Sequence, residues 1–327
     1  MAGIREVAKK AGVAVCTVSR VLNGTGKVAP ETKERIEAAM KELDYVPNEL
    51  ARGMFRKKSG VIAMLVPNIQ HPWFSSLAAE IEKELYKKGY KLMLCSTNDS
   101  VEREKEYFKI LKSNIADGLI CGTTRLKAED YAGVNKPIIM LDYKVNDNIP
   151  LVVSDHAQGG ELAAEAFSKA HCRYILHICS DYAPHEIMSY KSHEKLDDIL
   201  NARGIQTRRV SINWNDFDYE GYVKLAGYIL ESYPDIDGLM AADLPAAAFL
   251  KAAEALGKRV PEDFCIIAYD GTYTIKTSTR DFTSIDQPYP EIGKKAVEVV
   301  TALVEGETLV QTEYIFPVSI NVGKTTR

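Results

Sequence analysis

The apolar residues near the start of the chain follow the spacing of two very short helices. Each helix has one stripe of apolar positions three or four residues apart, and a tight turn at Gly12 separates the two stripes. The first stripe contains Val7, Ala8 and Ala11, and the second contains Val18, Val21 and Leu22. Two helices of this length cannot enclose a core by themselves, so the pattern predicts a third helix that packs on both.

A third amphipathic helix is predicted from Pro30 to Leu43. Proline suits the first position of a helix, where its missing N–H costs no hydrogen bond. Three short helices of this kind are typical of a helix-turn-helix, whose second helix binds in the major groove of DNA. The apolar face of the third helix contains Ile36, Ala39, Met40 and Leu43. The free side of the second helix carries Val15, Cys16, Thr17, Ser19 and Arg20.

From Val61 onward the pattern changes to short apolar runs that alternate with amphipathic helices. The predicted strands are Val61–Pro67, Lys91–Thr97, Gly118–Gly122, Pro137–Asp142, Leu151–Ser154, Tyr174–Ser180, Thr207–Ile212, Gly238–Ala242, Cys265–Tyr269 and Thr283–Ile285. The predicted helices include Phe74–Lys88, Arg103–Lys112, Gly159–Ala170, Tyr219–Ser232, Pro245–Leu256 and Glu291–Val304. Apolar strands that alternate with helices indicate parallel sheets covered on both faces. A stretch of this length exceeds one core, so we expect two α/β lobes with a ligand in the crevice at the carboxyl ends of the strands.

The charge is distributed unevenly between these two regions. Up to Lys58 the chain has twelve basic and seven acidic residues, a net charge of +5, whereas the whole chain carries −4 and the remainder therefore −9. A basic N-terminal region, residues 1–58, followed by an acidic region, residues 59–327, indicates that a polyanionic partner binds the N-terminal region only. A small helical hairpin with a solvated basic surface would show a similar local pattern, but the charge and the third helix favour DNA binding.

Several motifs make the chain similar to the lactose repressor family of bacterial transcription regulators. In the head they are Val7-Ala8, Ala11-Gly12-Val13, Thr17-Val18-Ser19-Arg20-Val21-Leu22-Asn23, Val28, Glu31-Thr32, Tyr45-Val46-Pro47-Asn48 and Leu50-Ala51-Arg52. In the body they are Val66-Pro67-Asn68, His71-Pro72-Trp73-Phe74, Asp117-Gly118-Leu119-Ile120, Leu141-Asp142, Ser154-Asp155, Val260-Pro261-Glu262-Asp263, Ile267-Ala268-Tyr269-Asp270 and Ser284-Ile285-Asp286-Gln287-Pro288. The resemblance therefore spans essentially the whole chain.

The resemblance implies two domains. Residues 1–58 would form an all-α helix-turn-helix headpiece that ends in a hinge helix at about 48–56. Residues 59–327 would form an α/β effector domain of the two-lobed periplasmic-binding-protein type I fold, with Rossmann-like lobes. In that fold the chain passes between the lobes more than once, here near Asp155, Gln287 and Val318.

The resemblance also implies which residues contact DNA. In the family the segment that matches Pro47–Arg56 becomes helical on DNA and inserts an apolar side chain between base pairs, and Met54 stands at that position. An ordinary disordered linker is the alternative for this segment. Arg20 is the one strong base reader, with guanine as its preferred partner. The full set of expected DNA contacts is Ile4, Val15, Cys16, Thr17, Ser19, Arg20, Asn23, Tyr45, Ala51 and Met54.

Two positions in the head depart from the family's pattern. Ala14 and Ala29 stand where the family commonly has serine before the second and third helices. Serine there caps the first turn, and its absence costs about 1 kcal/mol at each position. This headpiece should therefore depend strongly on Arg20, on backbone contacts and on the Met54 wedge.

For the effector, the resemblance implies a sugar pocket. Asp142, Asp270 and Gln287 match positions that contact hydroxyl groups in sugar-binding members, and charge-assisted hydrogen bonds from vicinal hydroxyls suit a carboxylate. Each aromatic residue in the set is as well explained by core packing as by a sugar-facing wall. The expected effector-binding residues are His71, Trp73, Phe74, Asp142, Ser192, Trp214, Phe217, Asp243, Asp270 and Gln287.

Three departures affect the expected ligand. Ser192 falls where the family usually has arginine, Ala242-Asp243 replaces an Asn-Asp pair, and Gly271 replaces an aspartate after Asp270. A pocket without the arginine is poorly suited to an anion, so we expect a neutral sugar held by a different set of contacts.

Other functional classes find little support in the sequence. There is no pair of histidines at metal-ligand spacing, no phosphate-binding glycine loop and no nucleophile elbow, so we expect no enzymatic activity, metal or cofactor. The six cysteines form no Cys-x-x-Cys pair and several lie in apolar strands, which suits a reducing cytoplasm. A secreted solute-binding protein would need an N-terminal signal, and a membrane protein would need a longer apolar run.

We therefore predict a ligand-responsive, cytoplasmic and nucleoid-associated repressor of a carbohydrate utilisation operon. It would act as a homodimer on a pseudo-palindromic operator, because one short recognition helix reads too few base pairs. The expected dimer surface includes the outward helix faces around Phe74–Leu85 and Leu244–Leu256. A non-sugar small molecule or a protein co-repressor remains an alternative effector. Whether the effector induces or co-represses stays open, because only its differential affinity for two states matters.

Overall fold

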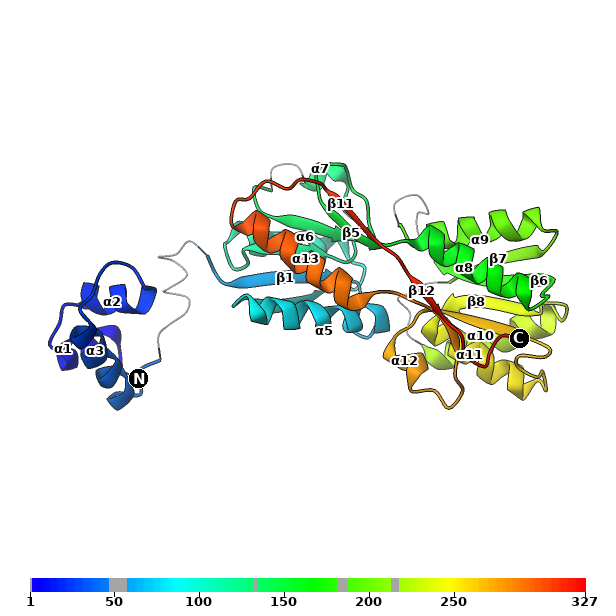
Figure 1. Cartoon of the computed structure of the whole chain (residues 1–327), viewed down its shortest axis with the longest axis horizontal. Helices are drawn as coiled ribbons and strands as arrows, with labels where there is room; N and C mark the ends of the chain where they lie inside the picture. The colour runs from blue at the N-terminus through cyan, green and yellow to red at the C-terminus, as the bar shows by residue number, and fades with distance from the viewer. Residues whose placement is uncertain (1, 47–57, 132–133, 181–186, 213–217) are drawn as a thin grey trace.

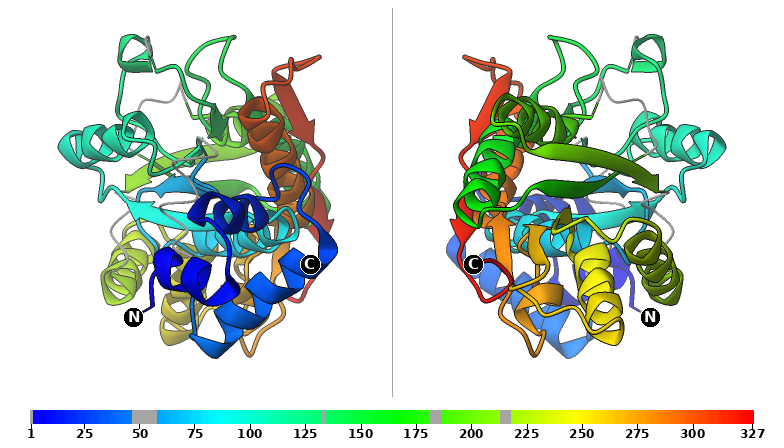
Figure 2. Two further views of the ribbon diagram at one scale, coloured as in Figure 1. Left: turned by 90° about the vertical axis from the view of Figure 1, so that its left-hand side faces the viewer. Right: turned by 90° about the vertical axis from the view of Figure 1, so that its right-hand side faces the viewer.

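A computed structural model of the chain describes residues 2–46, 58–131, 134–180, 187–212 and 218–327. Its elements form three parts, a helical headpiece and two α/β lobes, which lie in a row in Figure 1. The ends of this row and the helices on both sides of the sheets are visible in Figure 2. The arrangement agrees with the fold class expected from the resemblance.

The headpiece consists of α1 (Ile4–Ala11), α2 (Val15–Asn23) and α3 (Pro30–Glu42). Its small core is formed by the predicted stripes, with the buried residues Val7, Ala8, Ala11, Val18, Ile36 and Ala39. The turn at Gly12 is confirmed: this residue has φ 64°, and its N–H donates to the carbonyl groups at the end of α1. A side chain would be strained in this left-handed conformation, so glycine ends α1 and allows α2 to begin within a few residues.

The missing caps are also confirmed. Ala14 and Ala29 precede α2 and α3 with extended backbone, and neither provides a side-chain hydrogen bond to the helix. Pro30 stands in the first turn of α3 as predicted, and α3 ends at Glu42, one residue before the predicted end.

The first lobe is a sheet of six strands in the order β11-β5-β4-β3-β1-β2. All of its strand pairs are parallel. The strands are β1 (Val61–Val66), β2 (Lys91–Ser96), β3 (Gly118–Cys121), β4 (Ile138–Leu141), β5 (Leu151–Ser154) and β11 (Glu313–Phe316). Helices cover both faces of this sheet, because alternate residues of β1 are buried on opposite faces. On one face Ile62, Met64 and Val66 pack against α5 (Pro72–Lys87) and α13 (Tyr289–Val304). On the other face Ala63 and Leu65 pack against α6 (Val101–Lys112) and α7 (Ala128–Tyr131).

The second lobe is a sheet in the order β12-β10-β9-β8-β6-β7. Its strands are β6 (Tyr174–Ser180), β7 (Gln206–Ile212), β8 (Gly238–Ala242), β9 (Cys265–Asp270), β10 (Thr283–Asp286) and β12 (Ser319–Asn321). Its helices are α8 (His156–Lys169), α9 (Tyr190–Ala202), α10 (Tyr219–Ser232), α11 (Asp243–Ala255) and α12 (Tyr273–Lys276). Helices α8 and α9 cover one face, and α10 and α11 cover the other. Among the strands of the described residues, β12 alone departs from the prediction of parallel sheets, since it pairs antiparallel with β10.

The three expected passages between the lobes are confirmed. Asp155 links β5 of the first sheet to α8 of the second lobe, and Gln287 links β10 back to α13. Val318 lies between β11, at the edge of the first sheet, and β12, at the edge of the second, and Figure 1 shows this red segment crossing between the lobes. The lobes are therefore joined by three neighbouring segments of the chain.

Several helices begin earlier than predicted because of side-chain caps. The His71 side chain accepts a hydrogen bond from the Trp73 N–H, and α5 therefore begins at Pro72 and not at Phe74. Asp155 caps α8 by accepting from the Gln158 N–H at 2.9 Å, so this helix begins at His156 and not at Gly159. Apolar periodicity starts only after the first turn, which explains the late prediction.

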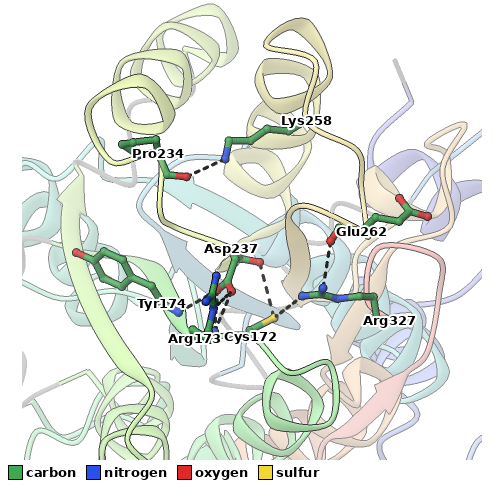
Figure 3. A network of polar contacts seen from close by, with 8 residues as sticks. All are labelled: Cys172, Arg173, Tyr174, Pro234, Asp237, Lys258, Glu262 and Arg327. Carbon is green, nitrogen blue, oxygen red and sulfur yellow. Dashed lines mark hydrogen bonds and ion pairs between the residues drawn. The ribbon is translucent and has the colours of Figure 1, made fainter.

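The last residue of the chain is tied to the base of the second lobe (Figure 3). Arg327 donates to the Glu262 carbonyl oxygen at 3.1 Å and contacts the Cys172 sulfur at 3.6 Å. The Asp237 carboxylate accepts from the backbone N–H groups of Arg173 and Tyr174 at 2.9 Å. These contacts fasten the end of the chain near the starts of β6, β8 and β9, at the edge of the sheet opposite the carboxyl ends of its strands.

The helices expected at a dimer surface also pack inward. Phe74 and Leu85, the two ends of the predicted stretch, are buried in the core of the first lobe. The outward face of α5 is instead formed by exposed residues such as Glu82, Lys83 and Tyr86. The position of the dimer surface therefore stays a prediction.

Candidate functional site

The first candidate site is the free side of α2. Val15 is 40% exposed, and Cys16 and Arg20 are exposed. Val18 faces the opposite way and is completely buried in the headpiece core. Thr17 is half-buried at the junction between the two sides. Helix α2 therefore presents a short side with one cationic group, Arg20, close to apolar and small side chains, as a recognition helix requires.

The other expected DNA contacts lie around this helix. The Asn23 amide donates to the Ser19 hydroxyl at 3.2 Å, so these two side chains are already linked one helical turn apart. Ile4 and Tyr45 are half-buried and pack against the headpiece core, which fixes their position. Two further expected contacts, Ala51 and Met54, lie outside the residues that the structure describes.

The second candidate site is a cleft between the two lobes at the carboxyl ends of both sheets. About 1020 Å³ of space, part of it open to solvent, is not filled by atoms. The first lobe contributes the start of α5 and the residue after β4, and the second lobe contributes the remaining walls. Eight of the expected effector residues line this cleft: His71, Trp73, Phe74, Asp142, Ser192, Asp243, Asp270 and Gln287. The other two, Trp214 and Phe217, lie outside the described residues.

The start of α5 forms an aromatic wall. The rings of Trp73 and Phe74 meet edge to face with centroids 4.7 Å apart, and His71 contacts Phe74 in the same way at 5.0 Å. Burial lowers the pKa of His71 to about 3, so this ring is neutral. The Trp73 indole N–H is buried and has no hydrogen-bond partner in the described part of the chain. The wall thus combines an apolar surface with one unused donor.

A chain of polar contacts connects the two lobes beneath this wall. His156 Nε2 lies 2.8 Å from Asp142 Oδ1, and His156 Nδ1 lies 2.8 Å from the Tyr269 hydroxyl. The first of these contacts is close but bent, since neither Asp142 Oδ1 nor His156 Nε2 has a well-aligned partner among the described residues. Asp142 also has a positive φ of 59°, an uncommon conformation that is frequent at binding sites.

Asp270 occupies the corresponding place in the second lobe, at the end of β9. Its φ is 117°, and its Oδ1 accepts from the Gln287 amide at 2.7 Å. Gln287 Oε1 in turn accepts from the Ser154 hydroxyl at 2.8 Å, so the contact reaches the first lobe. Burial, together with the nearby Asp243 carboxylate, raises the pKa of Asp270 well above its usual range. Asp270 and Gln287 are thus held in a fixed orientation across the passage between the lobes.

Asp243 lines the cleft, but its carboxylate already accepts hydrogen bonds from other groups of the protein. Its Oδ2 accepts from the N–H and the hydroxyl of Thr272, both at 2.6 Å, and its Oδ1 accepts from the Gly271 N–H at 3.3 Å. Burial outweighs these hydrogen bonds and raises the pKa of Asp243 to about 7. This side chain therefore shapes the loop after β9, and it has less capacity for an effector than Asp142.

Ser192 stands on α9, where it faces the cleft without adding charge. Its hydroxyl donates to the Ser189 carbonyl oxygen at 2.7 Å and lies close to the Tyr269 hydroxyl. Glycines at the start of α8 make this approach possible, since a Cβ on Gly160 would come within 2.2 Å of the Ser192 carbonyl oxygen, and one on Gly159 within 2.5 Å of the Tyr269 hydroxyl. Neither lysine nor arginine is among the described residues that line the cleft.

Some lining residues were not expected from the sequence. They include Ile178, Tyr222, Met240, Tyr269 and His193. Tyr269 directly precedes Asp270, and His193 directly follows Ser192, so a neighbour of an expected residue was the available indication in both cases. His193 has no histidine at metal-ligand spacing in sequence, whereas the fold places His177 against it. Within the described residues there is no group of three side chains arranged to hold a metal ion.

Two family models match the chain. The model of bacterial regulatory proteins of the lacI family matches residues 3–48, and the periplasmic binding protein-like domain matches residues 164–326. The ribose operon repressor of Halalkalibacterium halodurans is 35% identical over 100% of this chain and 98% of that protein. The chain belongs to the LacI family.

Solved structures of the family have the same architecture. A structure of the lac repressor dimer bound to operator and the anti-inducer ONPF is 25% identical, covers 99% of both chains and has a TM-score of 0.86. A LacI family transcriptional regulator from Enterococcus faecium with bound ribose is also 25% identical, covers 81% of this chain and 98% of that chain, and has a TM-score of 0.71.

As a LacI-family member, the chain is a transcription regulator with a helix-turn-helix DNA-binding headpiece and a periplasmic-binding-protein-like domain. This confirms the fold and the functional class expected from the sequence. No helix in the described ranges is both long and apolar enough to cross a membrane. The individual DNA-contacting and effector-contacting residues stay predictions, although the structure brings eight effector candidates together in one cleft.

Proposed function

We propose that the chain represses a carbohydrate utilisation operon in the cytoplasm, binds its operator DNA as a homodimer, and responds to a small neutral sugar in the cleft between the lobes. The names of its relatives support this proposal, since the Halalkalibacterium protein is a ribose operon repressor and the Enterococcus regulator holds ribose. The lac repressor structure is a dimer on operator, which supports the expected assembly.

The observation that carries the proposal is the set of buried polar atoms around the cleft. The Trp73 indole N–H is buried without a partner among the described residues, and Asp142 Oδ1, which lines the cleft, has only the bent contact with His156 Nε2 at 2.8 Å. Buried polar groups of this kind are costly unless something satisfies them. A polyhydroxylated ligand both accepts and donates hydrogen bonds and has an apolar face for the Trp73 and Phe74 rings, so it fits this set.

The charges favour a neutral ligand over an anion. The described lining contains three carboxyl groups, those of Asp142, Asp243 and Asp270, and neither lysine nor arginine. Burial lowers the pKa of both lining histidines, His71 and His193, so they add no positive charge. An anionic sugar phosphate would have no lysine or arginine to pair with among the described lining residues, and an unpaired charge is costly in a poorly hydrated cleft. Ser192, at the position where arginine was expected, removes the usual compensating charge.

Ligand binding would control DNA binding through the three neighbouring passages between the lobes. Gln287 and Ser154 lie at two of these passages and are linked to each other and to Asp270. A sugar that contacts both lobes favours one relative arrangement of them, and so changes the free energy of the arrangement that binds operator.

The test is a thermal-shift screen of the full chain with neutral sugars, sugar phosphates, nucleobases and amino acids. A ligand that binds only the folded state at 100 times its Kd stabilises by about 2.7 kcal/mol, so the Tm should rise by several degrees. We expect a neutral pentose or hexose to give the largest shift. A shift by a sugar phosphate or a nucleobase alone would contradict the proposed ligand class.

The second arm of the test is the variant Asp270→Ala. We expect it to bind operator normally without ligand and to lose the sugar response, because one of the fixed acceptors in the cleft is removed. Asp147→Asn is the matched control, since this acid is 90% exposed and pairs only with Lys144 in the described contacts. An Asp270→Ala protein that still responds like the wild type would remove Asp270 from the pocket.

A further inference from the structure

Two histidines in the second lobe form a contact that neither the apolar core nor the proposed sugar contacts use. His177 lies on β6 and is completely buried, whereas His193 lies on α9 and lines the cleft. Their Nδ1 atoms are 2.9 Å apart, and the rings are stacked with centroids 5.1 Å apart and 30° between their planes. Two ring nitrogens this close share one proton, so one ring donates and the other accepts.

An ion pair behind His177 decides the direction of this hydrogen bond. Asp197 Oδ1 lies 2.9 Å from His177 Nε2, in a close but bent approach, and Arg209 Nε donates to Asp197 Oδ2 at 2.6 Å. Although burial opposes its ionisation, the contacts with His177 and Arg209 lower the pKa of Asp197 below its usual range. Asp197 is therefore a carboxylate that only accepts, and the proton of His177 stands on the nitrogen that faces it, Nε2.

The positions of the remaining protons follow from this. With its proton on Nε2, His177 presents a lone pair at Nδ1, and His193 must donate from its own Nδ1. With one proton on each histidine ring, the His177–Asp197 contact and the His177–His193 contact each have one donor and one acceptor, and the fully buried His177 ring carries no charge. Burial also lowers the pKa of His193 well below its usual range. His193 is then a neutral ring whose Nε2 carries a lone pair.

We infer that His193 is a specificity-determining residue of the cleft, whose Nε2 accepts a hydrogen bond from a hydroxyl group of the effector, and that His177 and Asp197 are positioning residues that set its tautomer. This role rests on the proposed function, since it needs a ligand with hydroxyl donors. The arrangement resembles the orientation of metal-binding or catalytic histidines by a second hydrogen bond, here used for an uncharged ligand. In this role His193 adds an acceptor from the second lobe to the cleft that Trp73 lines from the first lobe.

The tautomer is tested first, because it can be measured without any ligand. Long-range 1H–15N correlation spectra of the full-length protein with labelled histidine, assigned with His193→Gln, should show His193 at pH 7.5 with a protonated Nδ1 and an unprotonated Nε2. In Asp197→Asn the population should move toward the Nε2–H form, which is the more common tautomer of free histidine. A wild-type His193 that is protonated at Nε2, or at both nitrogens, would overturn the inference.

Ligand binding tests the role itself. The probes are D-ribose and its monodeoxy analogues, with D-glucose and its monodeoxy analogues as a second series, measured by calorimetry. We expect His193→Leu to weaken binding of the sugar about tenfold, as loss of one hydrogen bond to a buried group predicts, and His193→Gln to restore part of it because its Oε1 can stand near the lost Nε2. His171→Asn is the control, because His171 is an exposed histidine after α8.

The deoxy analogues separate this inference from the proposed function. The wild type should bind one monodeoxy sugar about tenfold more weakly than the parent sugar, and His193→Leu should lose that discrimination. If the wild type binds the sugar and His193→Leu binds it equally well, or discriminates as before, only the role of His193 is wrong. If the wild type binds neither series, the proposed function is wrong, and this role with it.

Discussion

In the headpiece, the side chains expected to read bases in the major groove come from α2, a single helix of nine residues, and Val15, Cys16 and Arg20 among them are exposed. In the cleft, the side chains expected to contact the effector come from several strands and helices of two lobes. Most are buried, and most of the polar ones are hydrogen-bonded to other groups of the protein. DNA brings its own charge and its own rigid groove, so the headpiece needs only a fold that presents α2. A small ligand must be surrounded, and its contacts must be oriented in advance.

The two regions also differ in how much core supports them. The headpiece core has six buried residues, whereas each lobe has two large clusters, one on each face of its sheet. A single core substitution should therefore affect DNA binding and effector binding very differently.

The largest expected effect is that of Ile36→Ala, which removes the largest completely buried side chain of the headpiece core. Such a truncation costs about 2–5 kcal/mol, a large share of what so small a core supplies. Specific operator binding, measured by fluorescence anisotropy, should fall by at least about 100-fold, while sugar binding in the cleft stays unchanged. Ile36→Val should cost about 0.5–1.5 kcal/mol and keep most binding. Normal operator binding by Ile36→Ala would show that the headpiece is less dependent on this core than we infer.

Arg20→Ala should have the next largest effect. A bidentate contact between arginine and guanine is worth about 1–3 kcal/mol, so operator affinity should fall about 5- to 150-fold, with relaxed preference at one base pair. Random DNA should be bound with nearly unchanged affinity at the same salt concentration. Arg35→Ala on α3 is the matched control, because it also removes one exposed positive charge. An equal loss on operator and on random DNA would assign Arg20 to the phosphate backbone and not to a base.

Asp243, a buried acid that lines the cleft, should make the stability of the folded protein depend on pH. Burial raises its pKa to about 7, so the folded protein holds a proton that the unfolded chain releases at lower pH. Below the pKa of the unfolded chain, about 3.9, Asp243 is protonated in both states and does not lower the free energy of unfolding. As the pH rises from there through the folded-state pKa, Asp243 lowers the free energy of unfolding more and more. Between pH 4.5 and 7.5 the Tm of the wild type should fall by a few degrees more than that of Asp243→Asn. Parallel curves for the two proteins would contradict this.

The smallest expected effect is an increase in the stability of the headpiece. Ala14 already has the extended backbone of a capping residue, with φ −71° and ψ 149°, so Ala14→Ser should add the missing hydrogen bond at the start of α2. The headpiece should become more stable by about 0.5–2 kcal/mol. Heat denaturation followed by operator binding would measure this, with Ala38→Ser on the exposed side of α3 as a substitution that provides no cap. Equal effects of the two substitutions would mean that the gain does not come from capping.

The headpiece and the cleft also differ in how much of each can be predicted from short-range patterns in the sequence. The stripes that predicted the headpiece became its core, and the prediction of missing caps at Ala14 and Ala29 is confirmed, because caps and stripes depend on residues a few positions apart. Helix starts in the body were predicted late wherever a cap such as His71 or Asp155 extends the helix by a turn. The antiparallel pairing of β12 was missed, since three residues carry too little pattern to indicate a direction.

The hydrogen bonds around the cleft could not be predicted from short-range patterns in the sequence. Asp243 was expected among the effector-binding residues and lines the cleft, but only the fold brings Gly271 and Thr272 to its carboxylate as hydrogen-bond donors. His193 had no partner within reach in the sequence, and His177 became its partner only when β6 was placed beside α9. Such contacts join residues many positions apart, and their geometry depends on how strands and helices are packed in the lobe.

By itself, the sequence determined most of the elements, the helix-turn-helix and the division of charge between a basic headpiece and an acidic remainder, because these are set by residue type and short-range spacing. Only the tertiary structure decided which polar side chains meet in the cleft, which acids are hydrogen-bonded to the protein itself, and that His177 lies against His193. The reason is physical: hydrogen bonds require their atoms to lie within about 3 Å of each other, and a chain pattern cannot supply that precision across two lobes.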